Sequence, residues 1–294
     1  MSKRARASVV ISAVVAAVVA SPALAGIRYQ AVTETIPEER PKSSIRMLVE
    51  GWVEGERARI EFRESDNPVM GAGTYLLTED GGRTLVLVDP EEKTYSRWDL
   101  DAMMGAAGAV MQGMGPMLNV QISEPAVEKL LDEDGGAIHG RPTRHYRYRT
   151  TYTMKVKVMG IGSESAIEQV QDLWSTTDLA DAGLGVWLRT SPRQTGIEDI
   201  DRLIAAEMGK VEGFPLKMEV VATTTDKKGR QSVTRTRQEV TLLESASPDS
   251  ASFEVPAGFK EVPMAPMPGM EEGGEAASPF PKIFGKRKDK DDDG

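Results

Sequence analysis

The sequence predicts an α+β protein in which a large antiparallel β-sheet carries a few helices. Residues 57–62 and 146–158 alternate apolar and polar side chains with a period of two, which is typical of a strand with one buried face. Short breaks rich in Gly, Asp and Pro separate neighbouring apolar runs, and connections this short favour antiparallel neighbours. Helical signals are confined to residues 99–117, 124–131 and 195–211.

The stretch Gly51–Trp98 organises the chain as a meander of four strands. Asp80-Gly81 separates two apolar runs, and this pair is a strong hairpin signal because glycine accepts the positive φ of such turns. Pro90 fixes φ at the next turn. The continuous apolar run at 84–88 predicts a strand that is covered on both faces. The four strands are 57–62, 75–78, 84–88 and 94–98, and two further strands, 27–35 and 44–50, precede them.

The segment after Trp98 is rich in Gly, Ala and Met. Residues 99–117 predict a helix that its glycines weaken, and 118–122 predict a short strand. Ser123 then has the character of an N-cap for a helix over 124–131, with Gly135-Gly136 ending it.

The clearest alternation in the chain spans Arg144–Val158 and predicts either one long curved strand or two strands that continue each other around a bend. A returning strand follows at 167–176 and a short one at 186–189. Thr195 and Glu198 form a capping-box pattern that starts a helix ending before Gly213. Residues 216–225 and 232–243 then predict a hairpin.

The two ends of the chain predict processing and disorder. Residues 1–25 have the positive start, short apolar core and Ala23-Leu24-Ala25 site of a secretory signal peptide, cleaved after Ala25. An uncleaved anchor is the alternative, which the short apolar run and Pro22 disfavour. Residues 26–261 are expected to form one domain. Residues 262–294, rich in Pro, Met and Gly and then in charges, predict a disordered tail.

Composition narrows the location and the partners. Cysteine is absent, which excludes disulfides, thiol nucleophiles and the lipid-modified cysteine of a lipoprotein. The formal charge of −9 becomes −12 once a leader with three positive and no acidic residues is removed. So acidic a chain is not expected to bind nucleic acid. No second apolar run is long enough to span a bilayer, so we expect a freely soluble, monomeric periplasmic protein.

These segments, taken in order, resemble a known family. The pieces that carry the resemblance are GERARIEF, DGGRTLVLVDPEEKTY, HGRPTRHY, WSTTDL, GFPLKMEV and FEVPAGF. They are similar to an uncharacterised family of bacterial periplasmic proteins, domain of unknown function 4412, and more distantly to the LolA/LolB lipoprotein carriers. The resemblance implies a curved antiparallel half-barrel with a few helices packed on its concave face, where the carriers hold acyl chains. Nothing in this sequence directly matches the carriers' functional residues. Their lid arginine has no clear counterpart, although Arg57 and Arg59 lie in a similar strand.

Motifs for catalysis are absent from the sequence. It contains no GxSxG, HExxH or Walker loop, and its two histidines, His139 and His145, are expected at the surface. We therefore expect neither an enzyme nor a metal or other cofactor. Two groups of methionines, 103–117 and 264–270, leave Cu(I) binding or a chaperone-like role in envelope stress as an alternative. For the first group, methionine as an adaptable filler of apolar space is the favoured interpretation.

The remaining hypothesis is a ligand cavity on the concave face. Large apolar side chains there need a cover, either the protein's own helices or a ligand under a mobile lid at the glycine-rich segment 105–115. We expect a hydrophobic ligand, a lipid or a lipidated protein segment. A protein-interaction module with a filled core is the further alternative. The residues expected to line the cavity are Ile60, Phe62, Tyr75, Leu77, Met103, Met104, Met111, Met114, Tyr146, Tyr148 and Tyr152.

Overall fold

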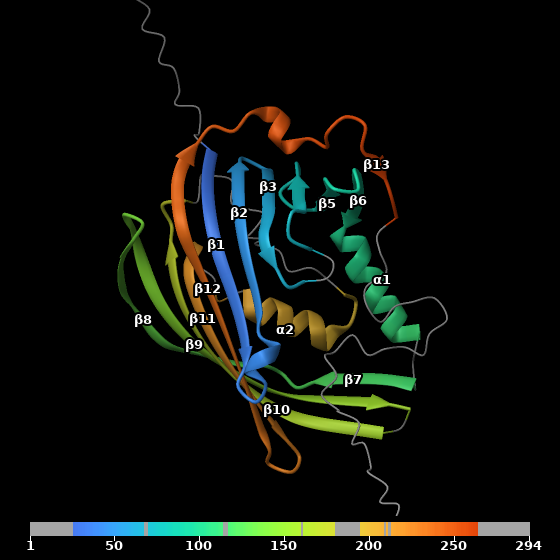
Figure 1. The fold of residues 1–294 in the computed structure, drawn as a ribbon. Coiled ribbons are helices and arrows are strands. Elements are labelled where there is room, and N and C mark those ends of the chain that lie inside the picture. The colour runs from blue at the N-terminus through green and yellow to red at the C-terminus, as the bar shows by residue number, and fades with distance from the viewer. Residues whose placement is uncertain are drawn as a thin grey trace, which may run out of the picture.

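A computed structural model describes residues 26–67, 70–113, 117–159, 161–179, 195–208, 210 and 213–263. In this part of the chain one curved sheet of thirteen strands is accompanied by two α-helices (Figure 1). The large curved antiparallel sheet and the small number of helices confirm the coarse part of the predicted fold, whereas helices packed on the concave face stay a prediction. Neither helix in the described ranges has the length and hydrophobicity needed to cross a membrane.

The strands follow the order β13-β6-β5-β4-β3-β2-β1-β12-β11-β10-β9-β7, and β8 pairs with β9 beside β7. Every pairing is antiparallel except that of β13 with β6. The bounds are β1 Gly26–Pro37, β2 Ile45–Glu54, β3 Arg57–Ser65, β4 Tyr75–Thr78, β5 Thr84–Asp89, β6 Thr94–Asp99, α1 Leu100–Gly113, β7 Leu118–Ile122, β8 Ala126–Ile138, β9 Arg141–Val158, β10 Ile161–Thr176, α2 Glu198–Met208, β11 Phe214–Asp226, β12 Gln231–Ala246 and β13 Lys260–Glu261.

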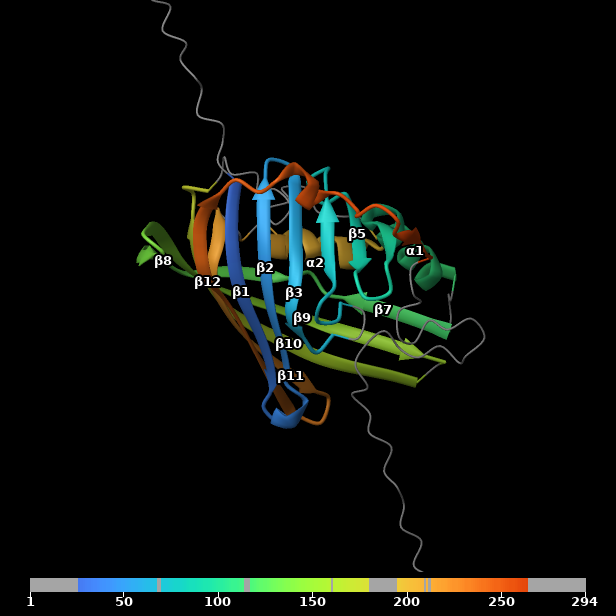
Figure 2. The same cartoon turned by 45° about the horizontal axis from the view of Figure 1, so that its top comes forward.

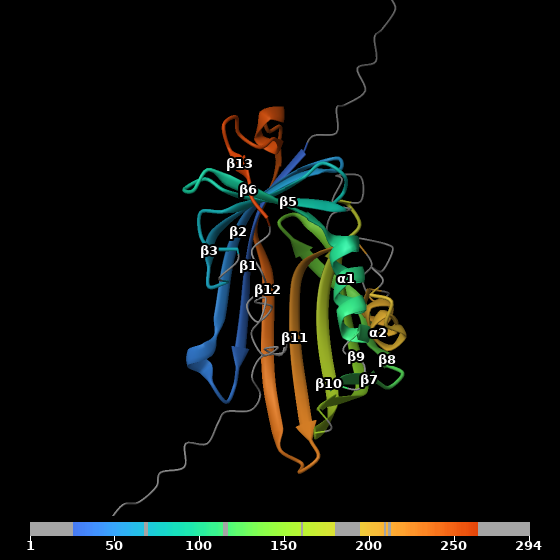
Figure 3. The same ribbon diagram turned by 90° about the vertical axis from the view of Figure 1, so that its right-hand side faces the viewer.

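The sheet bends between its two ends. Figure 2 shows β1 to β3 standing upright while β7, β9 and β10 run across below them. Figure 3, turned by 90°, shows β9 to β12 as long neighbouring strands with both helices at one side. The predicted meander corresponds to β3–β6, and the alternation in 144–158 belongs to one long strand, β9.

The register assigns the side chains to two faces. Directly opposed residues of antiparallel strands share a face. One row of such pairs crosses six strands through Tyr146, Leu173, Met218, Gln238, Thr33 and Met47. We call the face that carries this row the core face, because it holds the main hydrophobic cluster. Buried members of that cluster are Ile27, Tyr29, Ala31, Val49, Val53, Ala58, Ile60, Phe62, Leu76, Leu179, Phe214, Leu216 and Val240.

Strands β4 and β5 are covered on both faces, as the apolar run at 84–88 predicts. Leu85 and Leu87 pack against the main cluster, while Val86 and Val88 belong to a second cluster on the opposite, outer face. Val255 and Phe259 pack on that second cluster. The segment that leads to β13 therefore covers the outer face of the meander.

The predicted helix over 124–131 is wrong, because this segment is part of the edge strand β8. Ser123 caps no helix: its backbone and side chain bond to the backbone of Thr153 in β9. Two register shifts, one of them at Gly136 with φ 73°, let β8 follow the edge of β9. The long free edge of β9 supplied backbone partners that local helix propensity could not match.

Helix α2 exists, but the predicted capping box does not close. The partner of Thr195 is Asp201, whose carboxylate accepts from the backbone and hydroxyl of Thr195 at 2.6 and 2.7 Å. Glu198 instead pairs with Arg202 on the exposed side. Desolvation alone would raise the pKa of Asp201, but the hydrogen bonds from Thr195 and Gly196 outweigh it and lower that pKa. Asp201 is thus held as an anion beside the start of α2.

The predictions for the leader, for 186–189 and for most of the tail lie outside the described residues.

Candidate functional site

The predicted cavity residues divide between the two faces of the sheet. Ile60 and Phe62 lie on the core face in the main cluster, and Tyr146, Tyr148 and Tyr152 lie on the same face in β9.

Tyr75 and Leu77 correct the prediction, because they lie on the outer face. They pair with Glu61 and Arg59 rather than with the core-face positions of β3. The guanidinium of Arg59 stacks over the ring of Tyr75 at 3.8 Å. Alternation separates the two faces of a single strand, but the register between β3 and β4, which decides the faces that coincide, is not visible in the sequence.

Three of the predicted methionines, Met103, Met104 and Met111, belong to α1. Met103 and Met104 are half-buried there. The side chain of Met111, and Met114 as a whole, lie outside the described part of the structure. Helix α1 follows β6 directly, with Asp99 as its N-cap accepting from the backbone of Asp101 and Ala102.

A group of polar side chains interrupts the core face beside Tyr146, Tyr148 and Leu173. We call this group the inner polar cluster: Thr150, Tyr152, Gln169, Gln171, Glu207 and Lys210. The Lys210 ammonium, 1% exposed, lies 2.6 Å from the Glu207 carboxylate and 3.5 Å from the Gln171 amide oxygen. Gln169 donates to Glu207 at 3.3 Å. Burial, with a smaller contribution from the charge of Glu207, raises the pKa of Tyr152, so its phenol stays protonated.

One member of the inner polar cluster is left unsatisfied. Thr150 is fully buried, and in the described structure its hydroxyl has no hydrogen-bond partner. A buried polar group without a partner is unfavourable by roughly 1–3 kcal/mol, so such groups are rare in folded proteins. The cluster therefore contains a buried hydroxyl that has no hydrogen-bond partner among the described residues.

Helix α2 is attached to the sheet by polar contacts at its two ends. Near its start, Asp199 accepts from the backbone of Ile122 in β7 at 3.0 Å. Near its end, Glu207 accepts from Gln169 of β10. None of the residues of α2 is buried, although Ile200, Leu203, Ile204 and Met208 are half-buried. A helix held in this way separates from its sheet more easily than one with buried apolar anchors.

The two helices meet where α1 passes the segment before α2. A Cβ atom added to Gly108 would lie 1.7 Å from the backbone oxygen of Thr195. Glycine is therefore required at this position for close approach, and α1 and α2 are coupled through it.

We expect Gly108→Ala to separate α1 from α2 without unfolding the sheet. Alanine favours an isolated helix by about 1 kcal/mol relative to glycine, so lost docking is the reason for any destabilisation. Hydrogen exchange should show faster exchange across α1 and the start of α2. Gly105→Ala is the matched control, since a Cβ atom there meets nothing within 4 Å. Equal behaviour of the two variants would contradict the coupling.

His145 is buried rather than exposed, which corrects the prediction. Its ring stacks on Trp174 with centroids 4.1 Å apart, and its Nε2 lies 2.7 Å from the Asp172 carboxylate. Its Nδ1 lies 3.4 Å from Glu133 of β8. The error has the same source as the missed strand, because β8 is what covers this ring. His139 is at the surface as expected, in the turn between β8 and β9, with a ring nitrogen 2.7 Å from the Val240 carbonyl oxygen.

An open groove of about 650 Å³ lies where Ser123, Glu124 and Ala126 approach β9, β10 and β11. Most of its β-sheet lining comes from the outer face, including Thr151, Thr153, Glu168 and Thr223. Tyr152 is the one predicted cavity residue that lines it. The groove is thus distinct from the expected concave cavity.

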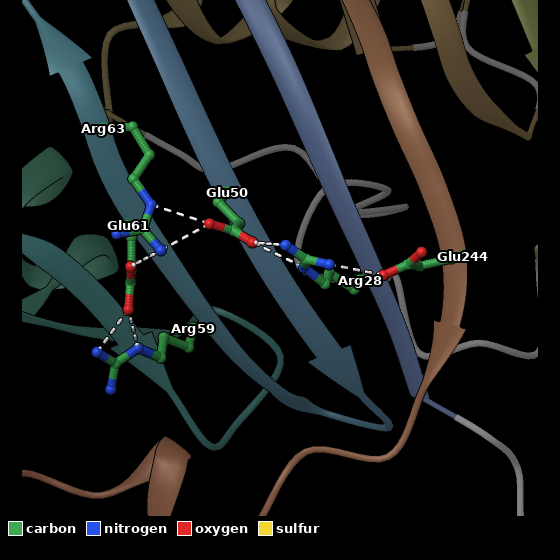
Figure 4. Close-up of polar contacts among 6 residues, drawn as sticks. All are labelled: Arg28, Glu50, Arg59, Glu61, Arg63 and Glu244. Carbon is green, nitrogen blue, oxygen red and sulfur yellow. Dashed lines mark hydrogen bonds and ion pairs between the residues drawn. The ribbon is translucent and has the colours of Figure 1, made fainter.

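A row of alternating charges crosses four strands on the outer face (Figure 4). We call it the ionic ladder: Glu244, Arg28, Glu50, Arg63, Glu61 and Arg59. Glu50 is its centre, with a side chain 6% exposed and carboxylate oxygens 2.5 Å from Arg28 and 2.6 Å from Arg63. Desolvation alone would raise the pKa of Glu50, but the hydrogen bonds and charges of the two arginines lower it below its ordinary value.

The ionic ladder favours the observed register of β1 to β3. The ladder keeps the outer face of β1 to β3 polar, so a slip by one residue would carry charges into the core.

The inner polar cluster was missed from the sequence. Its signal was present at Gln169 and Gln171, which occupy the apolar side of their strand between Ile167 and Leu173. Glu207 and Lys210 carried no such signal, because helix and loop positions acquire burial only from the tertiary fold.

Comparisons with known proteins find a likeness to solved structures. No family model matches the chain, and no curated protein matches its sequence. A solved LolA superfamily protein from Nitrosomonas europaea is similar to it with a TM-score of 0.29 and 9% identity. The alignment covers 79% of this chain and 90% of that chain. Membership in the family of unknown function 4412 stays a prediction.

Proposed function

We propose that this protein binds a hydrophobic ligand, a lipid or a lipidated protein segment, on the concave side of its sheet. In this proposal the concave side is the core face, and α2 with α1 forms a removable cover over it. The protein acts in the periplasm after its leader is cleaved behind Ala25, and it catalyses no reaction.

The observation that carries the proposal is the attachment of α2. A helix that completes a solid core buries apolar anchors, whereas α2 has no buried residue and holds the sheet through Asp199 and Glu207. Polar contacts of this kind exchange with water at little net cost when the helix moves away. An apolar chain entering beneath α2 would then replace water against the half-buried side of the helix.

The part of the core face beside the inner polar cluster supports the same conclusion. Tyr146, Tyr148 and Leu173 form an apolar cluster of their own, which the inner polar cluster adjoins. These three side chains are already buried, so a ligand would replace the cover that they have now, and covering one large apolar side chain contributes roughly 1.5–3 kcal/mol. The unsatisfied hydroxyl of Thr150 would meet the polar end of such a ligand. A ligand with an apolar chain and a polar end therefore fits this part of the core face.

Cross-linking α2 to the sheet tests the proposal. The chain has no cysteine, so Gln169→Cys/Glu207→Cys can be joined by a short thiol-specific cross-linker. We expect the cross-linked protein to lose displacement of a fluorescent fatty acid, because the cover no longer opens, and the same protein before cross-linking to retain it. Native mass spectrometry of protein purified from the periplasm should show co-purified lipid.

The control is a cross-link at Glu38→Cys/Arg235→Cys, which joins the exposed residue after β1 to an exposed residue of β12; their side chains lie 2.7 Å apart. It should leave fatty-acid displacement unchanged. A bare mass together with no fatty-acid displacement by the wild type would refute the proposed function. Unchanged displacement after cross-linking α2 would refute the cover alone.

A further inference from the structure

The turn between β9 and β10 exposes apolar side chains at the tip of a long hairpin. Ile161 is 82% exposed and Met159 is 71% exposed, and Val158 beside them is 46% exposed. Met117, 51% exposed, joins the same tip, because its carbonyl accepts from the backbone of Met159 at 2.8 Å. We call these four residues the hairpin tip. Contiguous exposed apolar side chains on a protein surface mark sites of interaction.

Met159 is unfavourable at its position in two independent ways. Its φ of 49° lies in the left-handed region, where glycine and asparagine are normally found. Its thioether side chain is also left in water. Folding stability and solubility both favour asparagine here, so the residue points to a role that needs an apolar side chain at this turn.

Five other tight turns between neighbouring strands in the described structure follow the ordinary pattern. They present glycine, charged residues or polar residues at their tips and no large aliphatic side chain. These turns are Gly55-Glu56, 79–83, 90–93, His139-Gly140 and 227–230. The hairpin tip thus differs from these turns, because only it presents large exposed aliphatic side chains.

Positive charge lies directly behind the hairpin tip. Lys157 and Lys155 are exposed one and three residues before Val158. Lys155 lies 3.5 Å from Glu164, and Lys157 has no ion pair among the residues that the structure describes. The chain as a whole carries a net charge of −9, so this end differs in sign from the molecule's average.

We propose that the hairpin tip inserts into the surface of a lipid bilayer that contains anionic lipids. Met159, Ile161, Val158 and Met117 enter the boundary between head groups and acyl chains. The long stem of Lys157 lets its ammonium remain among the anionic head groups while the tip is immersed. Bilayer contact goes beyond ligand binding on the core face, and either property can hold without the other.

Vesicle flotation tests the proposal with the purified full-length mature protein. We expect the protein to float with vesicles of phosphatidylglycerol and phosphatidylethanolamine, and much less with phosphatidylcholine alone. Met159→Asn/Ile161→Ser should reduce the bound fraction about tenfold or more, because two apolar anchors are lost. Lys157→Glu should weaken binding severalfold, and roughly 0.5 M salt should remove most of that difference.

Ile45→Ser is the matched control, because Ile45 is 52% exposed on a different strand, β2. It should bind vesicles like the wild type. A wild type that floats with no vesicle, or an Ile45→Ser variant that loses as much binding as the tip variant, would overturn the proposal. So would sedimentation showing a dimer that the tip variant dissociates while no vesicle binds, since a second copy would then be the partner.

A second measurement does not depend on flotation or on multiple substitutions. Met159→Cys introduces the only cysteine, which can carry an environment-sensitive fluorophore. We expect its emission to shift to the blue and intensify on adding anionic vesicles, as the probe leaves water. The same label at Ile45→Cys should show little change. Equal responses at both positions would contradict insertion through the hairpin tip.

Discussion

Replacing Glu50 by alanine is expected to destabilise the protein by about 3 kcal/mol. The substitution removes the only anion between Arg28 and Arg63. Breaking a buried ion pair by removing one partner is strongly destabilising, because the remaining charge stays uncompensated. The loss lies at the low end of that range here, since the guanidiniums are 35% and 50% exposed and keep Glu244 and Glu61 as partners. Urea unfolding at neutral pH measures the change.

Glu244→Ala is the control for this prediction. It removes the exposed end of the ionic ladder, where the Glu244 side chain is 46% exposed. An exposed ion pair contributes about 0–1 kcal/mol, so the loss should be at least about 2 kcal/mol smaller than for Glu50→Ala. Similar losses for the two variants would show that the ladder has no energetic centre at Glu50.

The contribution of Glu50 should disappear in acid. Its folded-state pKa is lowered below the ordinary value of 4.5, so the folded state binds the proton less readily than the unfolded state does. The stabilisation is therefore fully present above pH 4.5 and is lost as the pH falls through the lower, folded-state pKa. Thermal unfolding of wild type and Glu50→Gln should differ at neutral pH and converge in acid. A constant difference would contradict the assignment.

Gly51→Ala is expected to cost about 1–3 kcal/mol through overpacking. The Tyr29 ring lies across Gly51 on the core face, and an added Cβ would fall 2.2–2.5 Å from three of its atoms. The ring has little room to move, because Tyr29 is 3% exposed within the main cluster. Chemical denaturation of the purified variant measures the loss.

A double-mutant cycle with Tyr29→Leu separates overpacking from any effect of the strand itself. With the ring removed, Gly51→Ala should cost nothing or become slightly stabilising, since the methyl group fills vacated space. A cost that persists in the Tyr29→Leu background would show that the close contact is not the cause.

The sequence predicts a strand and its turn correctly where one face of the strand is exposed to solvent and the connection to the next strand is short. The alternation in 144–158 predicts the strand β9, and Asp80-Gly81 predicts the turn between β4 and β5, without any knowledge of the fold. The helix predicted over 124–131 was wrong, because the edge strand β8 is exposed over most of its length and so shows no alternation of buried and exposed residues. Its partner, the free edge of β9, exists only in the folded protein.

The sequence predicts which residues of one strand share a face of the candidate site, but it does not predict the full set of residues that meet there. Ile60, Phe62 and the tyrosines of β9 share a face because a period of two follows from the chain itself. Tyr75 and Leu77 fell on the other face because the pairing of β3 with β4 depends on where the connecting loop ends. The polar residues that meet beside Lys210 come from a helix end, a loop and two strands, and only the tertiary fold brings them together.

The centre of the sheet joins the two ends of the described chain. Gly26 of β1 lies opposite Ala246 of β12, and this pairing continues along the whole of β1. Pairing across so many intervening residues is slow, because the chain loses the entropy of loop closure before any stabilising contact between the two strands forms. The local hairpins of the meander can form early, whereas β1 keeps an open edge until β12 arrives. An exported chain would therefore complete this fold only after nearly all of it had left the translocation channel.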